Sequence, residues 1–187
     1  MKEVWGKFEG WLKTNFEAAF TDLNSPATED QIQQLESAIS TKLPDDFVQF
    51  LKIHNGQVGK SGWIINGSEL LSTERIIDEW GVWNDILKSG DFDGMTDERS
   101  NGIKEDWWNA KWIPFTYDGG GNHLCIDLDP AAEGSVGQII TMWHDDPERE
   151  VKAKTFREWF EQYVDDLIAG KYVYSDDYEA IVNVNDI

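Results

Sequence analysis

The residues with the side-chain types needed for chemistry stand closest together near the middle of the chain. His123, Cys125 and Asp127 alternate along residues 123–128, so an extended strand would turn all three side chains to one face. A thiol beside an imidazole is the pairing that a cysteine nucleophile and its base require. However, a cysteine within an apolar strand is more often an inert core residue. We therefore expect no catalytic residues, and an enzyme acting through this region is the least favoured hypothesis.

Two glycine-containing loops have the composition of ligand-binding loops but the wrong spacing. Gly56–Ser61 reads GQVGKS, with two residues between its first glycine and Gly-Lys where a phosphate-binding loop needs four. Asp91 and Asp93 could begin a calcium loop, but the glycine stands at position 4 instead of 6, and position 12 is Gly102 instead of Glu. The sequence therefore predicts ordinary polar loops in both places.

The histidines and the single cysteine form no metal-ligand pattern. His54, His123 and His144 lie in three different predicted elements, without the spacing of a metal-binding histidine pair. Cys125 alone excludes an internal disulfide and a site built from several cysteines. The sequence predicts no bound metal and no cofactor.

The charge of the chain favours some partners over others. Sixteen Lys and Arg stand against 36 Asp and Glu, a formal net charge of −20, which would repel a nucleic-acid backbone. Such a chain would meet a basic protein quickly, although acidity also serves plain solubility. The chain has no apolar run long enough to span a bilayer, and its first residues lack the apolar centre of a signal peptide. We expect a cytoplasmic protein that binds neither nucleic acid nor membrane.

Helices are predicted at both ends of the chain and strands in the middle. Helical spacing of apolar residues predicts helices at 4–20 and 74–87, and capping boxes begin two more at Thr28 and Thr155. A further short helix should follow Pro44. Strands are expected at 63–66, 70–71, 112–117, 123–128, 138–143, 149–153 and 172–174. Residues 89–109 lack a pattern and are expected to form a surface loop. This order predicts an α+β fold in a single domain, 1–187, with a core at about 5–174 and a frayed tail at 175–187.

Two segments carry a resemblance to a known family. Thr28–Gln57 predicts a pair of short helices punctuated by Leu43-Pro44 and ended at Asn55-Gly56, and Lys111–Ile140 predicts three strands joined by a Gly-rich turn and an Asp-Pro loop. In this order they resemble the SUKH superfamily, which contains the fungal cell-wall-synthesis regulators of the Smi/Knr type and many bacterial immunity proteins. The resemblance covers roughly residues 5–174.

The resemblance implies a mixed fold whose central, mostly antiparallel sheet is packed by N-terminal helices and a C-terminal helix. It also implies a protein that holds a partner without catalysing a reaction. The positions that match the family's motifs would then be framework residues: Trp112, Asp118, Asn122, Asp127, Asp129 and Gln138.

The resemblance leaves two functions open. We expect an immunity protein that binds and neutralises a cognate toxin domain, because toxins that attack nucleic acid are often basic and the chain lacks the long disordered arms of the fungal regulators. The alternative is a regulatory scaffold of the cell-wall-regulator type.

Tryptophans near loops and helix edges are the candidates for partner contact, because tryptophan is enriched at the energetic centres of interfaces. Acidic residues in neighbouring loops would meet a basic partner. The predicted partner-binding residues are Trp83, Asp91, Asp93, Trp107, Trp108, Trp143 and Asp145.

Overall fold

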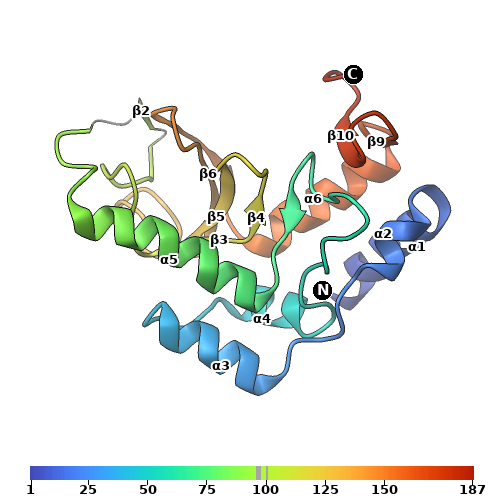
Figure 1. Ribbon diagram of the computed structural model, residues 1–187, viewed down its shortest axis with the longest axis horizontal. Helices are drawn as coiled ribbons and strands as arrows, with labels where there is room; N and C mark the ends of the chain where they lie inside the picture. The colour runs from blue at the N-terminus through green and yellow to red at the C-terminus, as the bar shows by residue number, and fades with distance from the viewer. Residues whose placement is uncertain (96–97, 100) are drawn as a thin grey trace.

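The computed structural model describes residues 1–95, 98–99 and 101–187 (Figure 1). The helices are α1 (Lys2–Asn15), α2 (Glu17–Thr21), α3 (Glu29–Ala38), α4 (Asp45–Leu51), α5 (Thr73–Ser89) and α6 (Phe156–Ile168). The strands are β1 (Glu69–Leu70), β2 (Glu98–Arg99), β3 (Trp112–Pro114), β4 (Thr116–Tyr117), β5 (His123–Asp127), β6 (Gln138–Met142), β7 (Glu148–Arg149), β8 (Val151–Ala153), β9 (Tyr172–Ser175) and β10 (Ala180–Asn183).

The main sheet has the strand order β3-β5-β6-β8, and every neighbouring pair in it is antiparallel. Cys125 of β5 lies opposite Pro114 of β3 and Ile140 of β6. Strand β4 pairs with β1, which leads directly into α5. The predicted α+β class with a central antiparallel sheet is confirmed.

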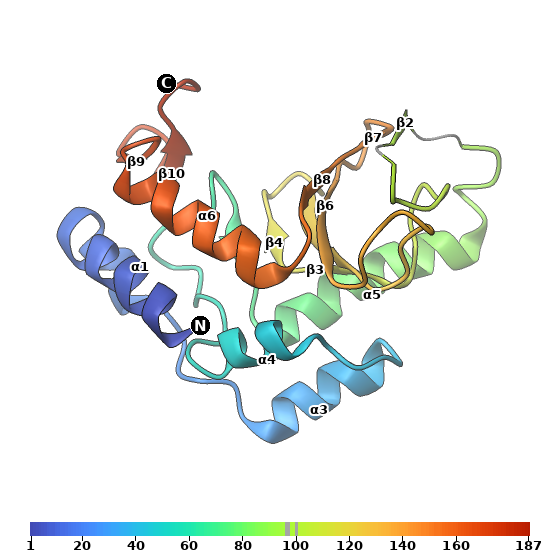
Figure 2. The same ribbon diagram turned by 180° about the vertical axis from the view of Figure 1, so that it is seen from behind.

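Helices cover both faces of the sheet. Helix α5 lies in front of it in Figure 1, and α6 lies in front of it when the molecule is turned in Figure 2. Successive side chains of a strand point to opposite faces. Cys125 accordingly packs in a core cluster with Trp83 of α5, whereas Ile126 packs in the larger cluster with α6 and the N-terminal helices.

Helix α6 follows the predicted pattern closely. The Thr155 hydroxyl accepts a hydrogen bond from the Glu158 backbone N–H and so caps the helix start. Every residue of its predicted apolar face is buried: Phe156, Trp159, Phe160, Tyr163, Val164 and Leu167. The predicted capping box of α3 is complete, with Thr28 and Gln31 each binding the other's backbone. The box predicted at Thr155 forms only in half, because the Glu158 carboxylate accepts from the Lys154 N–H instead.

The helix predicted at 4–20 is interrupted. Phe16 adopts φ −152° and ψ 65°, which separates α1 from α2. The apolar spacing continues across this break, and Phe16 stacks on Tyr174 of β9 at a ring distance of 4.0 Å. A tertiary contact therefore replaces the helical conformation that the local pattern favoured.

The strand predicted at 172–174 forms as β9, and the tail expected to fray at 175–187 supplies its hairpin partner β10. The N–H of Ile181 donates to the Trp63 carbonyl, and the Ile181 carbonyl accepts from Gly67. These bonds bury Ala180, Ile181 and Val182. The strand predicted at 63–66 supplies this pairing as isolated bridges, and its Asn66-Gly67 turn has the expected positive φ angles of 41° and 73°.

The segment 89–109 is only partly the surface loop that we expected. Ile103 and Trp108 are each 2% exposed and belong to the core cluster under α5. The prediction for residues 96–97 and 100 lies outside the described residues. Within the described part of the chain, no helix combines the length and the apolar composition that crossing a membrane requires.

Candidate partner-binding groove

Both ring nitrogens of His123 make hydrogen bonds within the protein. It is 1% exposed, with Nδ1 lying 2.6 Å from the Thr116 carbonyl and Nε2 lying 3.0 Å from the indole nitrogen of Trp83. The carbonyl can only accept and the indole can only donate, so Nδ1 carries the proton and Nε2 is the acceptor. Burial lowers the pKa of His123 to about 4. The ring is thus a neutral connector between α5 and the sheet.

Cys125 is equally enclosed. It is fully buried, and burial raises the pKa of its thiol well above the usual value. Thiols react as thiolates, so this environment suppresses its nucleophilicity. The geometry gives the strand that carries His123 and Cys125 a packing role.

Asp127 and Gln138 form a buried polar link at the far end of the same strand. The Asp127 carboxylate accepts hydrogen bonds from the Asp129 N–H and from Gln138 Nε2, both at 2.9 Å. Gln138 also donates to the Gly102 carbonyl, which ties the preceding loop to the sheet. Burial raises the pKa of Asp127 to about 6. Asp129 then binds Lys104 and Asn109 outside the sheet.

Asp118 organises the turn between β4 and β5. Its carboxylate accepts from the N–H groups of Gly120 and Asn122 at 2.8 and 2.9 Å. Burial would raise the pKa of Asp118, but these hydrogen bonds outweigh it and lower the pKa. Positive φ angles occur at Gly119 (82°) and Gly121 (105°), so the triple glycine is used as its composition indicated. Asn122 in turn accepts from the His144 N–H.

The predicted framework residues therefore make turn and sheet contacts. Trp112 is fully buried in the cluster under α5.

The GQVGKS loop binds an anion that belongs to its own chain. The Asp22 carboxylate accepts from the N–H groups of Gly59 and Lys60 at 2.9 and 3.0 Å. These are the donors that a phosphate would need, and they are already used.

Two of the predicted partner-contact residues are buried in the core and are not exposed to a partner. Trp83 and Trp108 are 7% and 2% exposed and stack on each other at 5.4 Å. Helix α5 needs an apolar filling between itself and the sheet, and these rings provide it. Trp107 is half-buried, and the Arg149 guanidinium carbon lies 5.3 Å from the centre of the Trp107 ring.

The acidic candidates Asp91, Asp93 and Asp145 are exposed, and nothing in their contacts assigns them a role. Among the predicted tryptophans, Trp143 lines a concave surface.

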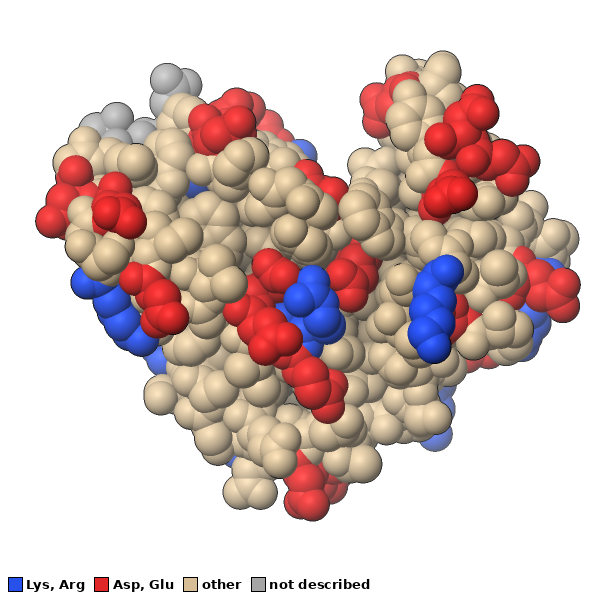
Figure 3. All heavy atoms as spheres, in the orientation of Figure 1, with Lys and Arg blue, Asp and Glu red and all other residues tan. Residues whose placement is uncertain are grey.

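That surface is a groove between the main sheet and the C-terminal hairpin. The molecule is notched between these two parts (Figure 3), and a groove of about 370 Å³ lies between the same elements. Strands β4–β6 and β8 line one side of it, and α6, the 65–68 turn and the start of β9 line the other. Its apolar walls are formed by Ile65, Leu124, Trp143, Trp159, Tyr163 and Tyr172.

The α6 side of the groove is a continuous row of rings. Trp159 stacks on Tyr163 at 5.9 Å, and Tyr163 contacts Tyr172 at 5.1 Å. The Tyr163 hydroxyl donates to the Ile64 carbonyl at 2.6 Å and accepts from the Asn66 N–H at 3.3 Å, which holds the row against the 65–68 turn. Sequence reasoning assigned Trp159 and Tyr163 to the core. Only the polar residues Gln162 and Asp166 on the same helix indicated that this face reaches the surface.

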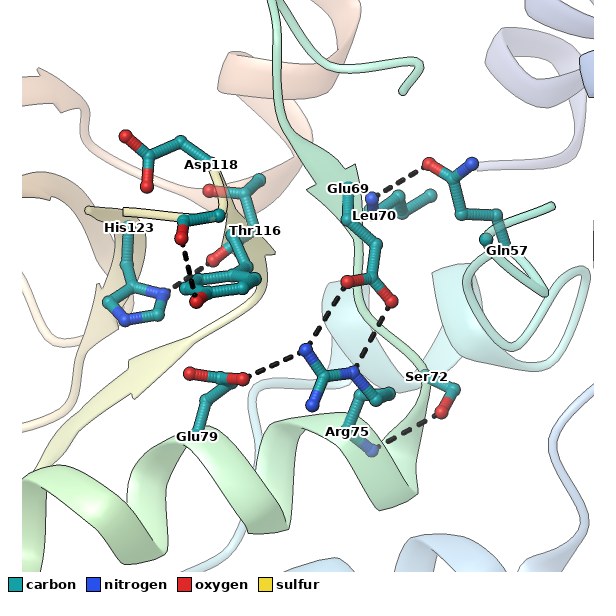
Figure 4. A network of polar contacts seen from close by, with 12 residues as sticks. Gln57, Glu69, Leu70, Ser72, Arg75, Glu79, Thr116, Asp118 and His123 are labelled. Atoms are coloured by element: carbon teal, nitrogen blue, oxygen red, sulfur yellow. Dashed lines mark hydrogen bonds and ion pairs between the residues drawn. The ribbon is translucent and has the colours of Figure 1, made fainter. Parts of the chain in front are cut away.

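A larger cavity, of about 680 Å³, lies between α3, α5 and the 55–59 loop, but its polar side chains serve the fold. The Asn55 amide holds both the N–H and the hydroxyl of Thr73. Gln57 accepts from the Leu70 N–H at 2.9 Å, as Figure 4 shows, and donates to the Gly62 carbonyl. These amides fix the connection between α4 and β1.

Arg75 on the edge of that cavity is neutralised by its neighbours. Figure 4 shows its guanidinium between two carboxylates, with Nη2 lying 3.3 Å from Glu69 and 2.8 Å from Glu79. The guanidinium carbon Cζ lies 5.6 Å from the centre of the Tyr117 ring. Burial would lower the pKa of Arg75, but the two carboxylates raise it. This cation joins α5 to β1 and β4, and its charge is not free for an anionic ligand. Among the described residues, no three His, Cys, Asp or Glu side chains are grouped so as to hold a metal ion.

Comparison with known proteins points to one family. A family model described as SMI1 / KNR4 family (SUKH-1) matches residues 26–162. The chain is 26% identical over 209 residues to the glucan synthesis regulatory protein of Neurospora crassa, an alignment that covers 92% of this chain and 39% of the relative. It is 27% identical to the cell wall biosynthesis/cell cycle regulator smi1 of Schizosaccharomyces pombe, with coverages of 95% and 38%.

A third relative is the cell wall assembly regulator SMI1 of Saccharomyces cerevisiae, 24% identical with coverages of 93% and 42%. The chain spans about two fifths of the length of these curated relatives.

Proposed function

The chain belongs to the SMI1/KNR4 family (SUKH-1), and on this basis we propose that it is a non-enzymatic, cytoplasmic protein-binding domain of the cell-wall-regulator type. The relatives described above are named as regulators of glucan synthesis or of the cell wall, and none of these three names describes an enzyme. These names support the alternative that the sequence left open better than they support toxin neutralisation.

The observation that carries the proposal is the aromatic groove beside α6. Aromatic rings at a concave surface are typical of protein-recognition sites, because a ring offers a large contact area for few frozen torsions. The residues with catalytic potential, in contrast, are enclosed and engaged in hydrogen bonds: His123 at both ring nitrogens, and Cys125 in the core.

A domain replacement would test the regulatory role. The segment of the S. cerevisiae cell wall assembly regulator SMI1 that aligns with this chain would be exchanged for residues 1–187. Growth would then be followed on a dye that binds cell-wall polysaccharide. We expect the chimaera to grow better than cells that lack the regulator. A matched chimaera carrying Phe50→Asp, which places a charge at a fully buried position, should not restore growth because its domain cannot fold.

A chimaera that accumulates to the normal level and still grows like the deletion strain would contradict the regulatory role. Toxin neutralisation would then be the hypothesis to examine, by co-expressing the chain with a basic nuclease domain encoded beside it and counting survivors.

A further inference from the structure

Three aromatic residues of the groove each carry a polar atom that has no hydrogen-bond partner among the described residues. Trp143, Trp159 and Tyr172 line the groove, and their indole nitrogens and hydroxyl make no hydrogen bond to any described residue. The neighbouring polar groups are engaged, since His123 is bonded at both nitrogens and the Thr141 hydroxyl accepts from the Glu150 N–H at 2.9 Å. Two N–H donors and a hydroxyl that stand beside apolar ring faces suit the backbone carbonyls of an extended peptide.

Acidic residues stand on both sides of the notch, as Figure 3 shows. Asp145 and Asp146 are exposed and follow Trp143 closely in the chain. In the hairpin, Asp176 and Asp177 are exposed in the turn between β9 and β10, at the end of β9 opposite Tyr172. The edge beside Trp143 and the tip of the hairpin therefore both carry negative charge, and we call these two edges the acidic rims.

The cations near the groove do not offset this charge. Lys152 lines the groove but pairs with Glu150, and Lys171, next to Tyr172, lies 2.7 Å from Asp166. The whole chain carries a formal charge of −20, so the rims lie within a broadly negative field.

We propose that this groove binds an extended segment of a partner protein that carries lysine or arginine between apolar residues. The apolar side chains fill the space between Trp143 and the row formed by Trp159, Tyr163 and Tyr172. The segment's carbonyls accept from the free indole N–H groups, and its cations reach the acidic rims or lie on the exposed face of Trp143. This inference rests on the proposed function and adds to it the class of partner and the place where it binds.

Fluorescence polarisation with three labelled octapeptides tests the proposal. All three carry leucine at four alternate positions, and the other four positions are lysine in the first, serine in the second and glutamate in the third. We expect the lysine peptide to bind about tenfold more tightly than the serine peptide, since the rims attract it, and the glutamate peptide to bind more weakly than both. Absence of binding by all three peptides, or equal binding of the lysine and glutamate peptides, would overturn the proposal.

Two pairs of variants test the location. Trp143→Ala should weaken binding of the lysine peptide by about tenfold or more, whereas Trp107→Ala, which removes the same ring outside the groove, should change it little. Asp145→Lys with Asp146→Lys should weaken binding several-fold more than Asp91→Lys with Asp93→Lys, although both pairs change the net charge by the same amount.

If the two variants of either pair weakened peptide binding equally, the peptide would be held by general charge or apolar attraction and not by the groove. That result would overturn the proposal. Thermal melting of each variant identifies any that fail to fold. If Trp143→Ala binds normally in this assay while the domain replacement still restores growth, the groove inference falls and the proposed function stands.

Discussion

The indole N–H of Trp83 donates a hydrogen bond to Nε2 of His123 at 3.0 Å, and the two rings meet nearly at right angles, at 82°. This bond joins α5 to β5 across the smaller core cluster. Nδ1 of the same imidazole is used by the Thr116 carbonyl, so the ring has no position left for a second proton without losing the bond from Trp83. His123 therefore makes the attachment of α5 dependent on pH.

Stability should rise with pH between about 4 and 6.5 because of His123. The pKa of His123 is lowered to about 4 in the folded chain, so in this window the unfolded chain binds more protons and acid favours unfolding. Its contribution is complete above about 6.5 and is lost progressively toward 4, on the order of 3 kcal/mol in all. Urea unfolding at a series of pH values checks this. His123→Asn, which cannot titrate, should lose this component of the slope, and an unchanged slope in the variant would contradict the assignment.

Asp127 should act in the opposite direction. Its pKa is raised to about 6 in the fold, so the folded chain binds more protons between about 3.8 and 6. The protonated carboxyl therefore favours folding at low pH, and this contribution is lost as the pH rises through about 6. Asp127→Asn should accordingly be relatively more stable, compared with the natural chain, at pH 7 than at pH 4. A difference between the two chains that stays constant from pH 4 to 7 would show that Asp127 does not titrate as described.

Removing the Tyr163 hydroxyl should destabilise the fold. Tyr163→Phe leaves the Ile64 carbonyl without its hydrogen bond inside the protein, at a cost of about 1–3 kcal/mol. Tyr178→Phe is the control, because that ring is 59% exposed and its hydroxyl makes one long bond of 3.4 Å; it should change stability by less than about 0.5 kcal/mol. Chemical denaturation measures both, and equal effects would mean that the Tyr163 bond does not stabilise the turn.

Two glycines should respond to alanine in opposite ways. Gly62 has φ +95°, and a Cβ there would lie 2.0 Å from the Glu179 carbonyl oxygen, so Gly62→Ala should push the β9–β10 hairpin away and cost at least about 2 kcal/mol. Gly81 lies inside α5 with nothing within 4 Å of its Cβ position, and Gly81→Ala should stabilise the helix by up to about 1 kcal/mol. Thermal unfolding measures both changes. A Gly62→Ala chain as stable as the natural one would mean that the hairpin does not depend on this close approach.

Association with a basic ligand should depend on salt. Raising the salt concentration from about 0.05 to 0.5 M should slow the association of the lysine octapeptide and change its dissociation less, because screening acts on the long-range attraction. Stopped-flow fluorescence separates the two rates. An association rate that does not change with salt concentration would show that the net charge of −20 does not speed association and serves solubility instead.

Much of the fold followed from local chemistry. The apolar face of α6 and the caps at Thr28 and Thr155 were predicted because helix periodicity and capping depend on residues three or four positions apart. The mostly antiparallel pairing of the central sheet was implied by the family resemblance, whereas the order of its strands was not predicted.

The partner site was decided by contacts between distant parts of the chain. Tryptophan is equally suited to a core and to an interface, so the sequence could not tell that Trp83 and Trp108 are buried while Trp143 lines a groove. What separates them is whether another element covers the ring: Trp83 of α5 packs against Trp108 and His123 of the sheet side, whereas the hairpin beside Trp143 leaves a gap.

That hairpin exists because Ile181 pairs with Trp63 and Gly67, more than a hundred residues earlier in the chain. Local pattern thus determined most of the helices and the buried face of α6, but neither the break at Phe16 nor the strand β10. Only long-range pairing decided which aromatic residues remain open to a partner.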